Sequence, residues 1–122
     1  MSIYQDLILD HYHNPRNYGE IKNAVSQVSL NNPLCGDNIT LYAIFAGDRL
    51  ADIKFVSEGC AISKASASML TEKIKGFSKN KLINLKSDFI IRLLGISLSP
   101  NRLKCALLVY EALKKLLWIK NY

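Results

Sequence analysis

Apolar and polar residues follow one period in the middle of the chain and a different period on either side of it. Residues 2–12 carry apolar side chains at helical spacing, and this pattern stops before Asn14-Pro15. The segment therefore predicts a short opening helix. Its apolar positions are Ile3, Leu7, Ile8 and Tyr12.

Between about residues 24 and 57 the pattern changes to alternation. Three segments show it, "AVSQVSL", "ITLYAIFAG" and "LADIKFVSEG", and Gly47-Asp48 separates the second from the third. Alternating segments bounded by turn residues are typical of strands, and a glycine-containing pair between two of them is typical of a hairpin. We therefore expect three strands, of which the last two form a hairpin.

The helical period returns after Gly59. Residues 60–75 form the first helical segment, which ends at Gly76 as a C-cap. Its apolar face consists of Ile62, Ala65, Met69 and Ile74. Residues 80–94 predict one or two short helices, followed by a loop at 95–99.

A final helix is expected from Ser99-Pro100, as N-cap and first helical position, to about Ile119. The positions expected to form its buried stripe are Leu103, Leu107, Tyr110, Leu113 and Leu117.

The order of these elements predicts the fold class. One helix, a three-stranded antiparallel meander and then only helices indicate an α+β fold with the helices packed on one face of the sheet. At 122 residues, of which 49% are hydrophobic, the chain is long enough for one core and too short for two ordinary domains. We therefore expect a single domain over residues 1–122.

Composition limits the classes of function. The richest apolar run, "FIIRLLGI", is interrupted by Arg92, so we expect no membrane span. The N-terminus has neither a basic leader nor a small-residue cleavage site, so we expect a cytoplasmic protein, or a matrix or plastid protein that has already been trimmed. The net charge is +6, but all lysines except Lys22 are spread over residues 54–120, without an arginine cluster or interleaved aromatic residues. These lysines indicate solvated helix faces and not a nucleic-acid surface.

Three cysteines carry the candidate chemistry. They are odd in number and widely spaced, which is poor material for a disulfide framework. Cys35 lies in a glycine-containing turn beside Asp37, Cys60 lies where the third strand meets the long helix, and Cys105 lies early in the last helix. The positive end of a helix favours a thiolate, especially at Cys60. If these element ends share one edge of the sheet, three thiolates and the Asp37 carboxylate form a tetrahedral set of four ligands.

Each candidate also has a purely structural interpretation. A lone cysteine is commonly a small buried hydrophobic residue, and the apolar helix around Cys105 favours that interpretation. The local sequence leaves both interpretations open for Cys60 and favours chemistry for Cys35. For His11 and His13, at a helix end, capping or exposure is expected in preference to metal ligation.

The motifs around the cysteines carry a family resemblance. The segments "NPLCGDNITL", "EGCAISKASASMLTEKIKG" and "RLKCALLVYEAL", together with the opening "YQDLILDHYHNPRNYG", closely resemble the U-type iron–sulfur cluster assembly proteins, which comprise IscU, SufU and the N-terminal domain of NifU. The resemblance covers residues 3 to about 118 and implies a SufE/NifU-like fold.

The resemblance also implies a site and partners. Cys35, Asp37, Cys60 and Cys105 would be the ligands of a transient [2Fe–2S] cluster or iron, or of a zinc ion. One or more of the three cysteines would accept sulfur, as a persulfide, from a cysteine desulfurase. A completed cluster would pass to recipient apoproteins or carrier proteins.

A carboxylate among three thiolates has a physical consequence. It is a harder ligand than sulfur and matches a soft cluster poorly, so one corner of the site can open. A scaffold that must release its product needs such a corner. We therefore expect replacement of Asp37 by alanine to lengthen the life of a bound cluster.

The resemblance leaves two functions open. Lys104 precedes the last cysteine, as in SufU-like members, where IscU-like members have histidine, whereas the short interval between Cys60 and Cys105 resembles IscU. The "LPPVK" segment through which IscU engages a chaperone is replaced by "SLSPN". In the first hypothesis the chain is a non-enzymatic scaffold for a [2Fe–2S] cluster. In the second it is a zinc-dependent sulfurtransferase that activates a desulfurase, with Cys35 taking the persulfide and no stable cluster. A structural zinc module is a third, minor interpretation.

Overall fold

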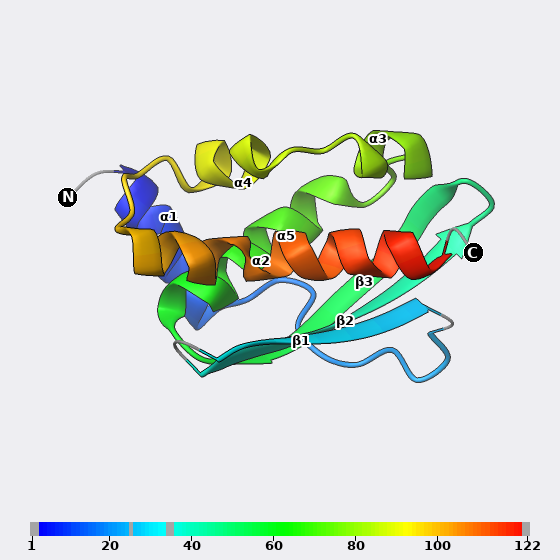
Figure 1. Cartoon of the computed structure of the whole chain (residues 1–122), viewed down its shortest axis with the longest axis horizontal. Coiled ribbons are helices and arrows are strands. Elements are labelled where there is room, and N and C mark those ends of the chain that lie inside the picture. The colour runs from blue at the N-terminus through cyan, green and yellow to red at the C-terminus, as the bar shows by residue number, and fades with distance from the viewer. Residues whose placement is uncertain (1–2, 25, 34–35, 121–122) are drawn as a thin grey trace.

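The computed structural model describes residues 3–24, 26–33 and 36–120 (Figure 1). An opening helix precedes three strands, and four helices follow them. The elements in chain order are α1 (Ile3–His13), β1 (Ser26–Asn32), β2 (Asp37–Ala46), β3 (Arg49–Glu58), α2 (Ala61–Ile74), α3 (Lys79–Ile83), α4 (Ser87–Leu94) and α5 (Pro100–Lys120). The α+β class expected from the sequence is confirmed, and residues 80–94 contain two short helices.

The three strands form one antiparallel sheet in the order β1-β2-β3. Asp37 is the first residue of β2 and pairs with Asn32, so it belongs to the strand. The hairpin between β2 and β3 turns at Gly47, whose φ is +61°. The register of this hairpin shifts at Ile44/Phe45, which is a β-bulge. Side chains three positions apart in a regular strand face opposite sides of the sheet. The bulge between Leu50 and Ile53 allows both to be buried on the same side.

One edge of the sheet is covered by the chain that follows α1. The Phe55 N–H donates to the carbonyl oxygen of Asn17 at 2.9 Å, and the Gly19 N–H donates to that of Phe55 at 2.8 Å. Tyr18 forms a parallel bridge with Phe55 between these two bonds. The outer edge of β3 is therefore paired along this stretch, which protects it against association with other strands.

The helices lie on one face of the sheet in two layers (Figure 1). Helices α2 and α5 pack against each other and directly against the strands, while α3 and α4 lie above them and α1 packs on α2. The core between the sheet and these helices includes Phe55, Leu41 and Ile53, none of which is exposed to solvent. Burying each of these side chains contributes roughly 1.5–3 kcal/mol.

Two of the expected apolar faces are only partly right. In α5, Leu113 and Leu117 are buried as expected, but Leu103, Leu107 and Tyr110 are only half-buried. The helix is enclosed by the sheet on one side and by other helices on another, so its buried surface is wider than a single stripe. That buried surface comprises Cys105, Ala106, Leu108, Val109, Ala112, Leu113, Leu116 and Leu117.

In α1, Ile8 is buried as expected, but Ile3 is 78% exposed and Leu7 39% exposed. This helix packs mainly on α2, so only a narrow strip of its surface is covered. His11, which the sequence predicted to be a capping or exposed residue, lies in that strip and is only 3% exposed.

The ends of the helices agree with the local sequence. Ser99 caps α5, because its side-chain oxygen accepts from the Arg102 N–H at 3.4 Å and its carbonyl oxygen from the Leu103 N–H at 2.8 Å. Gly95 ends α4 in the left-handed region, and the ring of Tyr4 lies where a Cβ at Gly95 would be. Helix α2 ends at Lys75 as C-cap, one residue before the expected Gly76. Within the described ranges, no helix has both the length and the apolar composition needed to cross a bilayer.

Candidate functional site

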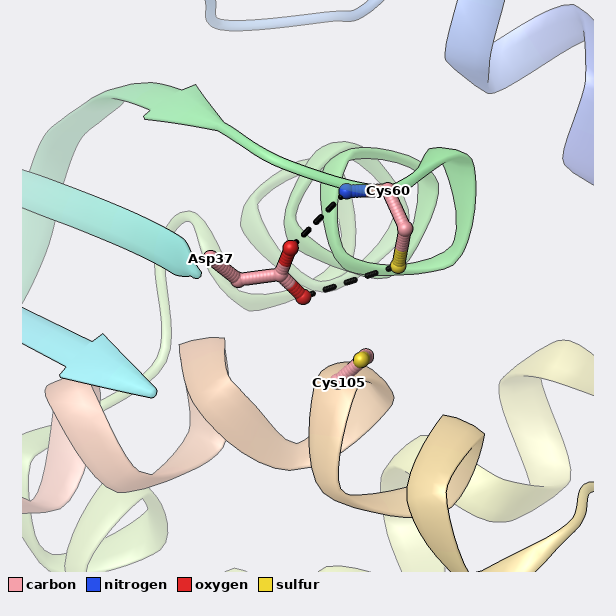
Figure 2. Close-up of side chains that lie close together, drawn as sticks. All are labelled: Asp37, Cys60 and Cys105. Atoms are coloured by element: carbon pink, nitrogen blue, oxygen red, sulfur yellow. Dashed lines mark hydrogen bonds between the residues drawn. The ribbon is translucent and has the colours of Figure 1, made fainter. Parts of the chain in front are cut away.

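Three of the side chains singled out in the sequence meet at one end of the sheet (Figure 2). Asp37 begins β2, Cys60 joins β3 to α2, and Cys105 lies in the second turn of α5. One carboxylate oxygen of Asp37 and the sulfur atoms of Cys60 and Cys105 all lie within 4.8 Å of one another. The tertiary fold therefore brings together residues that are far apart in the sequence.

The Asp37 carboxylate divides its two oxygens between two partners. Oδ1 accepts from the Cys60 backbone N–H at 2.9 Å, and Oδ2 accepts from the Cys60 Sγ at 3.5 Å (Figure 2). Cys60 is the N-cap residue of α2 and makes no side-chain capping bond of its own. The side chain of Asp37, which is only 1% exposed, therefore satisfies an amide at the start of α2, where the helix dipole favours negative charge.

Gly59 allows this close approach. Its φ is +139°, and a Cβ built there would lie 2.0 Å from Asp37 Oδ1 and 2.5 Å from Asp37 Cγ. Any other residue would be strained in its backbone and would collide with the carboxylate. Gly59 is thus part of the site, although the sequence had indicated it only as the end of a strand.

Ser63 is a further residue that the sequence had not singled out. Its hydroxyl donates to the Cys60 carbonyl oxygen at 3.1 Å, and its oxygen lies 4.0 Å from Cys60 Sγ. At 4% exposure it is enclosed by the protein. The serine of the "GCAIS" segment could have signalled this role, because a hydroxyl three residues after an N-cap can reach back to the cap.

A cavity of about 580 Å³ borders the two sulfur atoms. Its walls come from α1, the start of α2, the loop before α5 and the start of α5, and they are mainly apolar. The lining residues are Gln5, Ile8, Leu9, Cys60, Ala61, Ile62, Ile96, Asn101, Arg102 and Cys105. Cys60 is half-buried and Cys105 is 5% exposed, so Cys60 is the more accessible of the two thiols.

The fourth predicted ligand, Cys35, lies outside the described residues. Lys104, which precedes Cys105, is exposed and lines a second cavity of about 220 Å³ together with Asn31, Asn32 and Pro33. Its side chain therefore lies beside the end of β1.

The donor set suits a soft or borderline metal ion. Two cysteine sulfurs and one carboxylate oxygen at mutual distances below 4.8 Å match the ligand types of zinc and of iron–sulfur centres. The candidate cluster fits iron or zinc on chemical grounds, with Asp37, Cys60 and Cys105 as the residues that would hold it.

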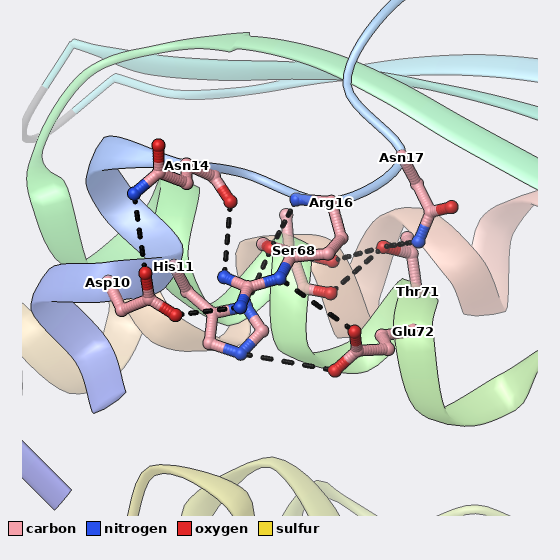
Figure 3. A network of polar contacts seen from close by, with 9 residues as sticks. Asp10, His11, Asn14, Arg16, Asn17, Ser68, Thr71 and Glu72 are labelled. Carbon is pink, nitrogen blue, oxygen red and sulfur yellow. Dashed lines mark hydrogen bonds and ion pairs between the residues drawn. The ribbon is translucent and has the colours of Figure 1, made fainter.

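Helix α1 forms one wall of the cavity and is held against α2 by polar contacts (Figure 3). His11 Nδ1 lies 2.7 Å from Ser68 Oγ, and the Arg16 backbone N–H donates to the same oxygen at 2.8 Å. The Arg16 guanidinium also pairs with Asp10 at 2.6 Å and with Glu72 at 3.8 Å. His11 thus has a structural role and is not one of the residues in the ligand cluster.

The surroundings of His11 favour its neutral form. Burial, and after it the nearby Arg16 charge, lower the pKa of His11, while Glu72 and Asp10 act in the opposite direction. Since Ser68 Oγ already accepts from the Arg16 amide, its hydroxyl can donate to Nδ1 of the neutral ring.

Comparisons with known proteins bear on what this geometry is for. Residues 3–122 match the family model described as the NifU-like N terminal domain. The zinc-dependent sulfurtransferase SufU of Bacillus subtilis is 40% identical over 131 aligned positions, which cover 93% of this chain and 88% of the relative. The iron–sulfur cluster assembly scaffold protein IscU 1 of Archaeoglobus fulgidus is 36% identical over 113 positions, which cover 93% of this chain and 73% of the relative.

Solved structures agree with these matches. The crystal structure of FiSufU, a proposed scaffold of the SUF system in Fervidobacterium islandicum AW-1, superimposes with a TM-score of 0.79 at 31% identity and covers 96% of each chain. A crystal structure of a hypothetical protein gives a TM-score of 0.84 at 33% identity, covering 95% of this chain and 97% of the other.

Proposed function

This chain belongs to the family of the NifU-like N-terminal domain, and on that basis we propose that it accepts sulfur from a cysteine desulfurase and supports the assembly of a [2Fe–2S] cluster for delivery to apoproteins or carrier proteins. We propose that residues 1–122 act as one functional domain. Iron and sulfide are its substrates, and the assembled cluster is its product.

The observation that carries this proposal is the meeting of Asp37, Cys60 and Cys105 at one end of the sheet. Cys60 borders the cavity, so a sulfur donor can reach it, and Cys105 lies beside it. We propose Cys35 as the fourth ligand, because the resemblance assigns it that role. All three cysteines are candidate sulfur acceptors.

Asp37 supports the release of the product. Only its Oδ2 faces the sulfur of Cys60, while Oδ1 is bound to the Cys60 amide. A carboxylate that offers one oxygen is a weaker partner for iron than a thiolate, so the Asp37 corner is the one that opens.

A second candidate function is that of a zinc-dependent sulfurtransferase. It is favoured by the 40% identity to the Bacillus subtilis protein of that name and by Lys104 before the last cysteine. The same residues would then hold zinc, which keeps its thiol ligands deprotonated.

Anaerobic reconstitution separates the two functions. The purified protein is incubated with a cysteine desulfurase, cysteine and ferrous iron, and visible absorption, iron, sulfide and zinc are measured. A brown protein with bound iron and sulfide supports the scaffold. A colourless protein that keeps zinc and raises desulfurase turnover supports the sulfurtransferase, and the absence of both results contradicts the proposal.

Matched variants link either result to the site. Cys60→Ser and Cys105→Ser should lose the cluster or the zinc, because each removes a sulfur ligand. Asp88→Ala removes an exposed carboxylate in the first turn of α4 and should behave like the unmodified protein. Equal metal content in Cys60→Ser and Asp88→Ala would contradict the assignment of the site.

A further inference from the structure

Cys60 and Cys105 share one space but differ in access. Their sulfur atoms lie within 4.8 Å of each other, and both residues border the cavity of about 580 Å³. Cys60 is half-buried at the N-cap of α2, whereas Cys105 is 5% exposed on α5. A reagent in the cavity meets one accessible thiol with a second, enclosed thiol directly beside it.

We propose that these two cysteines form a dithiol pair that reduces a sulfur atom carried by Cys60 to sulfide, with Cys105 as the attacking thiol. This inference rests on the proposed function, because it takes the sulfur of Cys60 from a persulfide donor. In this inference the thiols of Cys60 and Cys105 supply the two electrons that reduce the transferred sulfur to sulfide.

The step balances in atoms and electrons. The Cys105 sulfur attacks Sγ of the Cys60 persulfide, a Cys60–Cys105 disulfide bond forms, and the bond from Cys60 Sγ to the outer sulfur breaks. The outer sulfur leaves with the bonding electron pair as hydrosulfide and takes up the proton of the Cys105 thiol. The outer sulfur is reduced to sulfide and the two cysteines are oxidised to the disulfide, with no other reactant.

The position of the sulfurs selects the inner sulfur as the point of attack. Sγ of Cys60 lies within 4.8 Å of the Cys105 sulfur. Attack on the outer sulfur would only move the persulfide to Cys105, whereas attack on Sγ releases the outer sulfur as sulfide.

The fold permits the disulfide. An S–S bond is about 2.05 Å long, and the two sulfurs lie within 4.8 Å of each other, so they must approach by no more than about 2.8 Å. A change of χ1 at one cysteine moves its sulfur by a distance of this order. Cys60 has extended backbone angles of φ −76° and ψ 162° and therefore lies outside the regular helix, where rotation of its side chain meets less resistance.

The proximity of Cys105 makes the internal reaction faster than reaction with a thiol from solution, because its sulfur is held within 4.8 Å of the Cys60 sulfur. The product has the oxidation state that an iron–sulfur cluster needs. The resulting disulfide removes two ligands from the site until an external dithiol reduces it, so each sulfide released has to be followed by a reduction step.

The test uses metal-free Cys35→Ser protein, in which only this pair of thiols remains. Glutathione persulfide serves as the sulfur donor under anaerobic conditions and is removed by rapid desalting. Released sulfide and the intact protein mass are then followed with time. We expect one equivalent of sulfide and a final protein mass lower than that of the reduced protein by two hydrogens.

The matched control is Cys35→Ser/Cys105→Ala, in which an alanine replaces the buried thiol. It should keep the added sulfur on Cys60 and release sulfide at least about tenfold more slowly, because an intramolecular thiol held in place outcompetes thiols in solution. Circular dichroism checks that both proteins are folded, and Cys35→Ser/Cys105→Ser provides a second replacement.

Two results would overturn the proposal. One is sulfide release at equal rates with and without Cys105. The other is a persulfide that stays on Cys60 or moves intact to Cys105. Chemical loading bypasses the desulfurase, so failure of enzymatic transfer combined with Cys105-dependent sulfide release would refute the proposed function and leave the dithiol chemistry standing.

Discussion

Gly59→Ala tests whether the contact between Gly59 and Asp37 builds the site. Gly19→Ala is its matched control, because Gly19 has a φ of +133° against +139° at Gly59, while nothing lies within 4 Å of a Cβ built at Gly19. Both variants place alanine in the same unfavourable backbone region, at a cost of about 1–3 kcal/mol each. Only Gly59→Ala also drives a methyl group to 2.0 Å from Asp37 Oδ1.

The expected difference between the two variants follows from the bond that is displaced. The Cys60 N–H bond to Asp37 Oδ1 involves a charged acceptor, and losing it costs about 1.5–3 kcal/mol. Gly59→Ala should therefore lower the free energy of unfolding by about 1.5–3 kcal/mol more than Gly19→Ala does. It should also weaken zinc binding, because the carboxylate is pushed away from the Cys60 sulfur.

Urea unfolding of the metal-free proteins, followed by circular dichroism, measures the difference in stability. Competition with a chromophoric chelator measures zinc affinity. In an Asp37→Ala background the cost of Gly59→Ala should fall toward that of Gly19→Ala, since the two nearest atoms, Oδ1 and Cγ, are gone. Equal destabilisation by Gly59→Ala and Gly19→Ala in the unmodified background would refute the reasoning.

Three further predictions concern separate parts of the molecule. Asp37→Ala should lengthen the lifetime of a reconstituted cluster during anaerobic transfer to an apoprotein, because the weak corner of the site is removed; faster cluster loss would contradict this. Because the pKa of His11 is lowered on folding, its contribution to stability is complete above its ordinary pKa of 6.5 and is lost as the pH falls through the folded value. The unfolding free energy should therefore decline below about pH 6.5 less steeply in His11→Gln than in the unmodified protein, and identical slopes in urea titrations would exclude His11 as the cause. Lys114→Met should lower the unfolding free energy by about 1–3 kcal/mol, because the carbonyl oxygens of Leu82 and Ile83 lose a charged donor. Lys115→Met, on the exposed side of the same helix, should have little effect, and equal urea midpoints for the two lysine variants would count against this account.

The order and type of the elements follow from local patterns, because alternation and helical spacing report directly on which face of an element is buried. The limits of that information are visible in α5. Leu107 and Tyr110 fit a single stripe by spacing, yet contacts with the sheet and with other helices bury Cys105, Ala106 and Leu108 more deeply. A one-dimensional period cannot indicate that a helix is covered from two sides.

The candidate site shows a similar division. Spacing alone could not bring Asp37, Cys60 and Cys105 together, and the resemblance of their motifs supplied that expectation. The two interpretations of Cys105 also turn out to be compatible, since it is 5% exposed and lies in the cluster. The burial of His11 could not be read from its neighbours in sequence, because it depends on Ser68, which lies 57 positions away.

The divided carboxylate of Asp37 has a consequence for the speed of ligand replacement. With a metal held through Oδ2, an incoming ligand has to displace only that oxygen from the metal. Oδ1 stays hydrogen-bonded to the Cys60 N–H. The displaced Oδ2 would stay close to the metal and would bind again when the incoming ligand leaves. Ligand exchange at Asp37 should then be quick in both directions.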